Sequence, residues 1–89
     1  MTLPSWWVRD ALCVHSHEGA WNSATGNGYY GGMQMDVNFM ATYGADFEHR
    51  YGGYANVWPP KAQLVASYRA WRTLGWRPWP NTAAMCGLL

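Results

Sequence analysis

Acidic side chains that could act as a general acid are scarce in this sequence. Only five carboxylates occur among its 89 residues, and Glu18 alone lies at the C-terminal end of an apolar helical pattern. The helix dipole disfavours a negative charge at that end, and so favours the protonated form that an acid catalyst needs. The alternative is an ordinary helix-end glutamate in solvent. Glu18 is therefore the first candidate for catalysis, and Asp36 is its one candidate partner.

Histidines and cysteines close to Glu18 suggest two other chemistries, but their spacing supports neither. His15 and His17 are two residues apart, so they do not share a helical face, and no third metal ligand follows at a recognisable spacing. Cys13 and His17 are four residues apart, but Cys13 lies mid-helix among apolar neighbours, unlike an activated thiol. We therefore expect no metal, no cofactor and no cysteine nucleophile.

The two cysteines, Cys13 and Cys86, lie near opposite ends of the chain. A chain this short buries a modest core and is marginally stable without help. A disulfide that closed most of the chain would contribute roughly 4 kcal/mol and would imply an oxidising compartment. The alternative is a pair of free, buried thiols in a reducing compartment.

The composition excludes several classes of protein. Apolar residues make up 49% of the chain and charged residues 12%, where an average domain has about 25% charged residues. This balance excludes a disordered chain. The net charge is +1 and the six cationic residues are dispersed, so we expect no nucleic-acid partner. No apolar run is long enough to span a membrane, and the first residues show no signal-peptide pattern.

A helix and a glycine-rich segment must position Glu18. Apolar spacing predicts the helix over residues 4–17, and Gly19 ends it. Residues 19–35 are glycine-rich and irregular, with a strong turn signal at Asn27-Gly28 and a short extended excursion expected over residues 29–35.

The rest of the chain is expected to be mainly helical. Asp36 and Gly44 are typical of the two ends of a short helix, and a further turn is expected over residues 45–51. Pro59-Pro60 opens the longest helix, residues 61–74, with an apolar stripe of Leu64, Tyr68 and Trp71. A last turn, capped by Asn81, would bring Cys86 to the first helix.

Seven tryptophans and six tyrosines are more than one small core needs. Those on helical stripes are expected in the core. Others lie in glycine- and proline-rich loops, where an aromatic ring can stack on a sugar. These are Tyr29, Tyr30, Trp76 and Trp79. The alternative is that they pack back over a thin core.

Residues 25–34, Thr-Gly-Asn-Gly-Tyr-Tyr-Gly-Gly-Met-Gln, resemble the T-G-N-G-Y-Y-G-G-(L/M/V)-Q signature of resuscitation-promoting-factor catalytic domains. These are transglycosylase-like proteins of actinobacteria and their phages, with a reduced lysozyme fold. In the usual pattern, C-E-x-G-G-N-W, a cysteine directly precedes the glutamate. Here four residues separate Cys13 from Glu18, and the step from Glu18 to Trp21 is two residues shorter. Further similarities cover nearly the whole chain: Tyr43-Gly44, Gln63, Gly75-Trp76, Pro78-Trp79-Pro80 and Cys86-Gly87.

The resemblance implies one lysozyme-like α+β domain over residues 1–89, mainly helical with a glycine-rich, β-like wing. It implies cleavage of the β-1,4 bond between N-acetylmuramic acid and N-acetylglucosamine in peptidoglycan. Glu18 matches the catalytic glutamate, and Cys13 with Cys86 matches the disulfide of the family. The candidate substrate-binding residues are Asn27, Tyr30, Gln34, Asp36 and Trp76.

Three functions remain open on this basis. The first is a lytic transglycosylase that uses Glu18 alone as acid and then base. The second is a lysozyme-type muramidase, with Asp36 or a bound water completing the site. The third is a non-catalytic module that binds peptidoglycan glycan strands. We expect a monomer, or one domain of a longer chain, that acts outside the cell at the wall or belongs to a phage virion or lysin.

Overall fold

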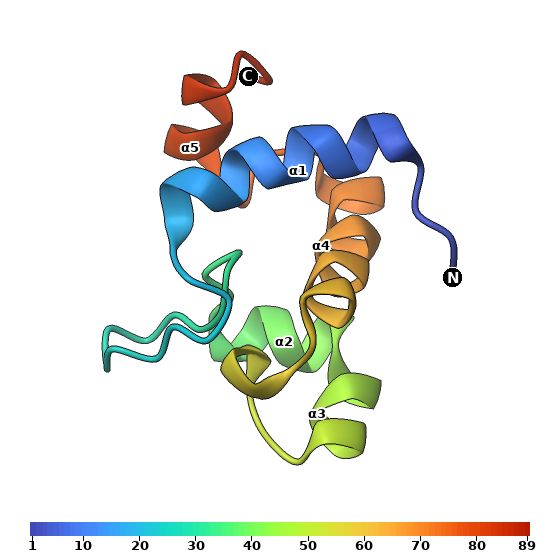
Figure 1. Ribbon diagram of the computed structural model, residues 1–89, viewed down its shortest axis with the longest axis vertical. Coiled ribbons are helices and arrows are strands. Elements are labelled where there is room, and N and C mark those ends of the chain that lie inside the picture. The colour runs from blue at the N-terminus through green and yellow to red at the C-terminus, as the bar shows by residue number, and fades with distance from the viewer.

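The computed structural model describes residues 1–89 as a mainly helical domain with almost no strand (Figure 1). Helix α1 crosses the central helix α4, α5 lies beside α1, and α2 and α3 lie beside α4 below α1 in this view. No helix has the length and apolar character needed to cross a membrane. The elements are α1 (Ser5–Glu18), α2 (Val37–Tyr43), α3 (Ala45–Tyr51), the 3-10 turn η1 (Ala55–Val57), α4 (Pro60–Leu74) and α5 (Pro80–Met85).

Most helix boundaries follow from local signals that the sequence carries. Asp36 caps α2 as predicted, because its Oδ1 accepts a hydrogen bond from the Phe39 backbone N–H at 2.8 Å. Gly52 ends α3 with a φ of 70°, and Gly75 ends α4 with a φ of 64°; residues with a side chain rarely adopt this conformation. The predicted helices at 45–51 and 61–74 are thereby confirmed.

Two local predictions differ from the structure. Helix α5 begins at Pro80 and its N-cap is Trp79, so the prediction that Asn81 caps this turn is wrong. Proline favours the start of a helix at its own position, because it fixes a helical φ and lacks an N–H, and no side chain caps α5. The excursion expected over residues 29–35 is a single antiparallel bridge between Tyr30 and Met35, closed by a turn.

The core forms where α1 packs on α4 and on the segment that follows α4. Trp7 of α1 is fully buried and stacks on Trp76 with a ring-centroid distance of 5.8 Å. Every residue of α4 from 62 to 67 is buried, so its N-terminal half is enclosed on all sides. The predicted apolar stripe of α4 therefore omits buried residues, since Ala66 and Ala70 are fully buried. Tyr68 and Trp71, which belong to the predicted stripe, are only half-buried.

A buried glutamine of α4 is hydrogen-bonded to three backbone groups outside the helix. Gln63 is inaccessible to solvent, and its Oε1 accepts a hydrogen bond from the Gly32 N–H at 2.8 Å. Its Nε2 donates to the carbonyl of Trp21 at 2.9 Å and to the carbonyl of Trp58 at 3.0 Å. Two of these partners lie in the glycine-rich wing (residues 19–35) and the third lies just before α4, so one side chain joins the wing at two points to the start of α4.

The wing is rich in glycine because its backbone packs directly on buried side chains. A Cβ on Gly31 would collide with Oε1 of Gln63, and one on Gly32 would collide with the indole of Trp21. Gly31 also has a φ of 78°. The glycines at these two positions therefore allow close approach rather than flexibility.

We expect Gln63→Leu to lower the free energy of unfolding by roughly 2–5 kcal/mol, because the substitution leaves a buried N–H and two carbonyls without partners. Urea denaturation followed by circular dichroism measures the change. Ser67→Ala is the matched control, since the Ser67 hydroxyl is equally buried but bonds only within α4, to the carbonyl of Gln63. An equal loss of stability in the two variants would contradict the role given to Gln63.

Candidate active site

Glu18 is the last residue of α1, and its half-buried side chain faces a cavity of about 360 Å³. Gly19 follows in an extended conformation, with a φ of −176°, so the chain leaves the helix at once and does not cover the carboxylate. This cavity, called the first cavity below, is formed by the end of α1, the wing and the start of α5. Its lining residues are Glu18, Tyr29, Gln34, Pro78, Trp79, Pro80, Asn81 and Thr82.

The carboxylate of Glu18 has one hydrogen-bond partner in the structure. The Thr82 hydroxyl of α5 donates to Glu18 Oε2 over 2.6 Å, and both side chains are half-buried. Sequence reasoning missed Thr82, although a signal was present. Thr82 is four residues before Cys86 and so shares a face of α5 with the cysteine that was expected to reach α1.

A disulfide fixes α5 on α1 close to this hydrogen bond. Cys13 and Cys86 are joined across 73 residues of sequence, with their Cα atoms 6.1 Å apart. Cys13 lies one turn and one residue before Glu18, and Cys86 lies one turn after Thr82. The predicted disulfide is confirmed, and it brackets the Glu18–Thr82 pair.

Two further cavities continue the first one into a groove. A cavity of about 180 Å³ shares four lining residues with the Glu18 cavity: Tyr29, Gln34, Pro78 and Trp79. A third cavity, of about 500 Å³, shares Asp36, Phe39 and Pro78 with the second and ends at Tyr43, Leu74 and Arg77. Together they form a groove, mainly uncharged, that begins at Glu18.

Gln34 lies in the wall of this groove in a strained conformation. It lines the first two cavities and is the one residue other than glycine with a positive φ, 50°. Its Nε2 donates to the carbonyl of Gly31 at 2.9 Å, and its Oε1 accepts from Asn27 Nδ2 at 3.4 Å. A side-chain residue held in this region costs about 1–3 kcal/mol and is typical of functional sites.

The loop aromatics divide into two groups. Tyr29 is 48% exposed and lines the first two cavities, as does one surface of Trp79, whose Nε1 donates to the Met33 carbonyl. Trp76 is only 8% exposed, stacks on Trp7 in the core and lines none of the three cavities. Tyr30 packs against Tyr54 with ring centroids 4.8 Å apart, also outside the groove.

Of the two remaining predicted contacts, Asn27 lines none of the three cavities and Asp36 lines two of them. Asn27 is exposed, and its Oδ1 accepts from the Tyr29 N–H, so it shapes the turn that carries Tyr29. Asp36 lines the second and third cavities but not the one that holds Glu18. One oxygen of Asp36 is already engaged with the first turn of α2.

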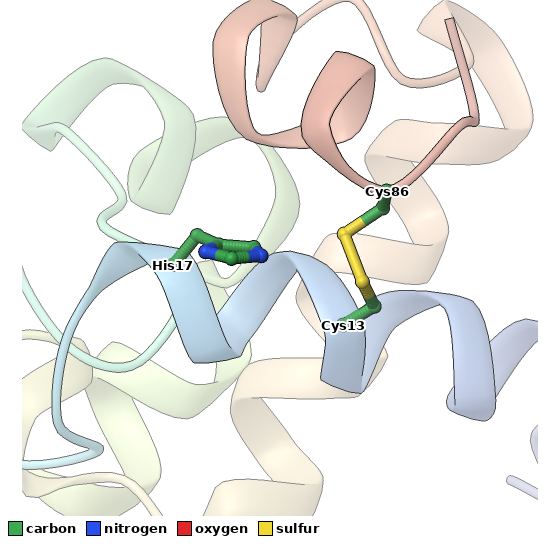
Figure 2. A group of neighbouring side chains, drawn as sticks. All are labelled: Cys13, His17 and Cys86. Carbon is green, nitrogen blue, oxygen red and sulfur yellow. A yellow bond between two sulfur atoms is a disulfide. The ribbon is translucent and has the colours of Figure 1, made fainter.

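The two histidines beside Glu18 have separate surroundings. The ring of His15 stacks on Trp21 with centroids 3.7 Å apart, and its Nδ1 lies 2.8 Å from the Gly32 carbonyl, so it joins α1 to the wing. Figure 2 shows His17 on the same side of α1 as the disulfide, and its ring nitrogen and the two sulfurs lie within 4.8 Å of one another. Both sulfurs are covalently paired, so His17 alone offers a free ligand atom there.

A carboxylate with a lowered pKa, Asp46, lies outside the groove. Two hydrogen bonds from the Arg69 guanidinium, at 2.8 and 3.1 Å, lower the pKa of Asp46 below its usual value. Arg69 also donates to the carbonyl of Tyr43. This cluster connects α2 and α3 to α4, which is a structural role.

Similar proteins are known, although no protein-family model matches the chain. The chain is 34% identical over 82 residues to resuscitation-promoting factor Rpf1 of Corynebacterium glutamicum, a match that covers 92% of this chain. It is 32% identical over 78 residues to resuscitation-promoting factor RpfB of Mycolicibacterium smegmatis, covering 88%. It is 28% identical over 88 residues to resuscitation-promoting factor Rpf of Micrococcus luteus, covering 98%. The chain spans 40%, 21% and 35% of the lengths of these relatives.

We expect loss of the disulfide to lower the free energy of unfolding by roughly 4 kcal/mol, because the cross-link closes a long loop in the unfolded chain. Urea denaturation of the wild type with and without a thiol reductant measures the loss. The control is the double variant Cys13→Ser/Cys86→Ser, which should match the reduced wild type and should not respond to reductant. Equal stability of oxidised and reduced wild type would contradict a formed cross-link.

Proposed function

The chain is a resuscitation-promoting-factor-like domain, and from this we propose that it cleaves the glycan strands of peptidoglycan. The proposed bond is the β-1,4 linkage between N-acetylmuramic acid and N-acetylglucosamine. The proposed reaction is that of a lytic transglycosylase, in which Glu18 serves first as acid and then as base. The site of action would be the bacterial cell wall, outside the cytoplasm.

The observation that carries this proposal is the setting of Glu18. It is the one carboxylate in the first cavity, at the start of a groove lined by aromatic and amide side chains. Sugar rings are uncharged and present flat apolar faces together with hydroxyl groups. Tyr29 offers such a ring an aromatic face, and Gln34 offers amide hydrogen-bonding groups on the same wall.

The first chemical step uses Glu18 as the acid. Its carboxyl proton passes to the oxygen that bridges the two sugars, and the bond from that oxygen to C1 of the muramic acid breaks. The N-acetylglucosamine leaves with the proton on its new hydroxyl. Positive charge develops at C1, and the ionised Glu18 carboxylate nearby stabilises it.

The second step uses the same carboxylate as the base. Glu18 takes the proton from the 6-hydroxyl of the muramic acid, and that oxygen bonds to C1 to close a 1,6-anhydro ring. Glu18 is then protonated again and ready for the next bond. No water enters the reaction, so no second carboxylate is required to activate one.

A hydrolytic reaction would make a different demand on the site. Standard glycosidases place two carboxyl groups about 5–9.5 Å apart across the scissile bond. Asp36 is the nearest candidate along the groove, but it lines the neighbouring cavities and caps α2. The single carboxylate in the first cavity therefore favours the transglycosylase route.

We expect Glu18→Gln to reduce cleavage of purified peptidoglycan at least about 100-fold, since the amide can neither donate the acid proton nor take one up. Turbidity loss of a cell-wall suspension measures cleavage, and co-sedimentation with the same walls should show that binding is retained. Glu48→Gln is the matched control, because it makes the same change on α3 outside the groove. Wild-type clearing by Glu18→Gln would leave the enzymatic role of Glu18 without support. If the wild type binds walls but does not cleave them, the domain is a binding module.

Mass spectrometry of the released fragments separates the two reactions. We expect anhydro-muramic acid ends, which are lighter by one water than reducing ends, because the 6-hydroxyl rather than water attacks C1. Fragments carrying reducing muramic acid ends in a wild-type digest would instead identify a muramidase. In that case Asp36→Asn should reduce cleavage, whereas the transglycosylase route predicts little change in its turnover.

A further inference from the structure

We propose that Thr82 is a positioning residue for Glu18, and that its hydroxyl selects which carboxylate oxygen meets the glycan. The inference rests on the proposed function of Glu18. It names a residue on α5, the last helix of the chain, as part of the catalytic apparatus. The observation behind it is the 2.6 Å hydrogen bond from Thr82 Oγ1 to Glu18 Oε2.

The hydrogen bond makes the two oxygens of Glu18 unequal. An ionised carboxylate is only an acceptor, so the Thr82 hydroxyl must donate to Oε2. When Glu18 carries its acid proton, the same donor favours the carbonyl form at Oε2 and leaves the proton on Oε1. Oε1 has no protein partner in the structure, and the cavity is open to Glu18. Thr82 therefore directs the acidic proton to the oxygen that is free to meet the substrate.

The backbone of Thr82 is held firmly enough for this task. Cys86, the residue after the end of α5, is bonded to Cys13 of α1, and Ala83, which lies between Thr82 and Cys86 in the sequence, is fully buried. Pro80 fixes the first turn of α5. Threonine is branched at Cβ and has few rotamers, so its hydroxyl is pre-oriented at low entropic cost.

A purely structural role for this contact is a weaker explanation. The disulfide already joins α1 and α5, so a second link at the same place is not needed to hold the two helices together. The Thr82 hydroxyl instead donates its hydrogen bond to Glu18, the one carboxylate that lines the first cavity. A hydrogen bond to a charged group, partly shielded from water, is also the stronger kind.

The test compares Thr82→Val, which keeps the shape and removes the hydroxyl, with Thr82→Ser, which keeps the hydroxyl. The oxidised protein is assayed on soluble glycan fragments of peptidoglycan. We expect Thr82→Val to lower kcat roughly 10-fold to 100-fold, the loss that corresponds to one hydrogen bond to a charged group. KM should change less than about twofold, and Thr82→Ser should recover most of the lost kcat. Thr73→Val, on the exposed end of α4, is the matched control and should behave as the wild type.

Three outcomes overturn the inference. Wild-type kcat in Thr82→Val, together with inactivity of Glu18→Gln, removes the role of Thr82 while the proposed function stands. An equal loss of kcat in Thr82→Ser and Thr82→Val shows that the hydroxyl is not responsible. A change in KM alone assigns Thr82 to substrate binding instead.

A spectroscopic measurement keeps the inference testable without turnover. The carboxyl ¹³C resonance of Glu18 should move in Thr82→Val, because the donor to Oε2 is lost, and should stay close to wild type in Thr82→Ser. Thr82→Ala replaces the valine variant if that variant misfolds, as judged by circular dichroism. If the wild type cleaves no glycan, the proposed function fails. The Glu18 resonance still shows whether Thr82 donates a hydrogen bond to the carboxylate. An unchanged resonance in the hydroxyl-deleting variant contradicts the inference.

Discussion

The structure depends on one buried amide, the side chain of Gln63. Burying a primary amide is costly unless its polar atoms are paired, and here Oε1 and both hydrogens of Nε2 find backbone partners. Its partners lie at Trp21, three residues after Glu18, and at Gly32, two residues before Gln34. A single side chain of α4 therefore holds the wing at two points, one close in sequence to Glu18 and one close to Gln34. A fully satisfied buried network of this kind favours one arrangement over its alternatives.

The glycine-rich wing is a consequence of that arrangement. Its backbone must come close enough for the Gly32 N–H to reach Gln63, while the Gly32 carbonyl meets His15 on the other side. Side chains at Gly31 or Gly32 would prevent both contacts. The wing is thus an ordered platform between α1 and α4, and the strain of Gln34 at its end is supported by this packing. The most recognisable stretch of the sequence is the one with the strictest backbone geometry.

Local signals were sufficient for the helices and insufficient for the aromatic side chains. The Asp36 cap and the terminating Gly52 and Gly75 act within a few residues, so the sequence alone places the helix ends well. The burial of Trp76 depends on Trp7, which is 69 positions earlier in the chain, and no local pattern reports such a contact. A proline- and glycine-rich setting made Trp76 look like a ligand-facing loop residue, whereas the turn that contains it folds back onto the core. Glu18 was identifiable because acids are rare, but Thr82 required the pairing of the cysteines to be known.

The position of the cross-link explains how Glu18 can keep its place although no cysteine precedes it directly. In the pattern that the chain resembles, the cysteine adjoins the glutamate; here His17 has that position and Cys13 lies four residues earlier. Four residues are slightly more than one helical turn. Compared with a cysteine at position 17, Cys13 therefore lies on nearly the same face of α1 but about 6 Å further from Glu18 along the helix axis. Along the last part of the chain, Thr82 lies beside Glu18, and Cys86, four residues later, is bonded to Cys13. Thr82 therefore donates its hydrogen bond to the carboxylate of Glu18. The covalently bonded cysteine beside Glu18 is thus exchanged for Thr82, a residue that donates a hydrogen bond to the carboxylate itself.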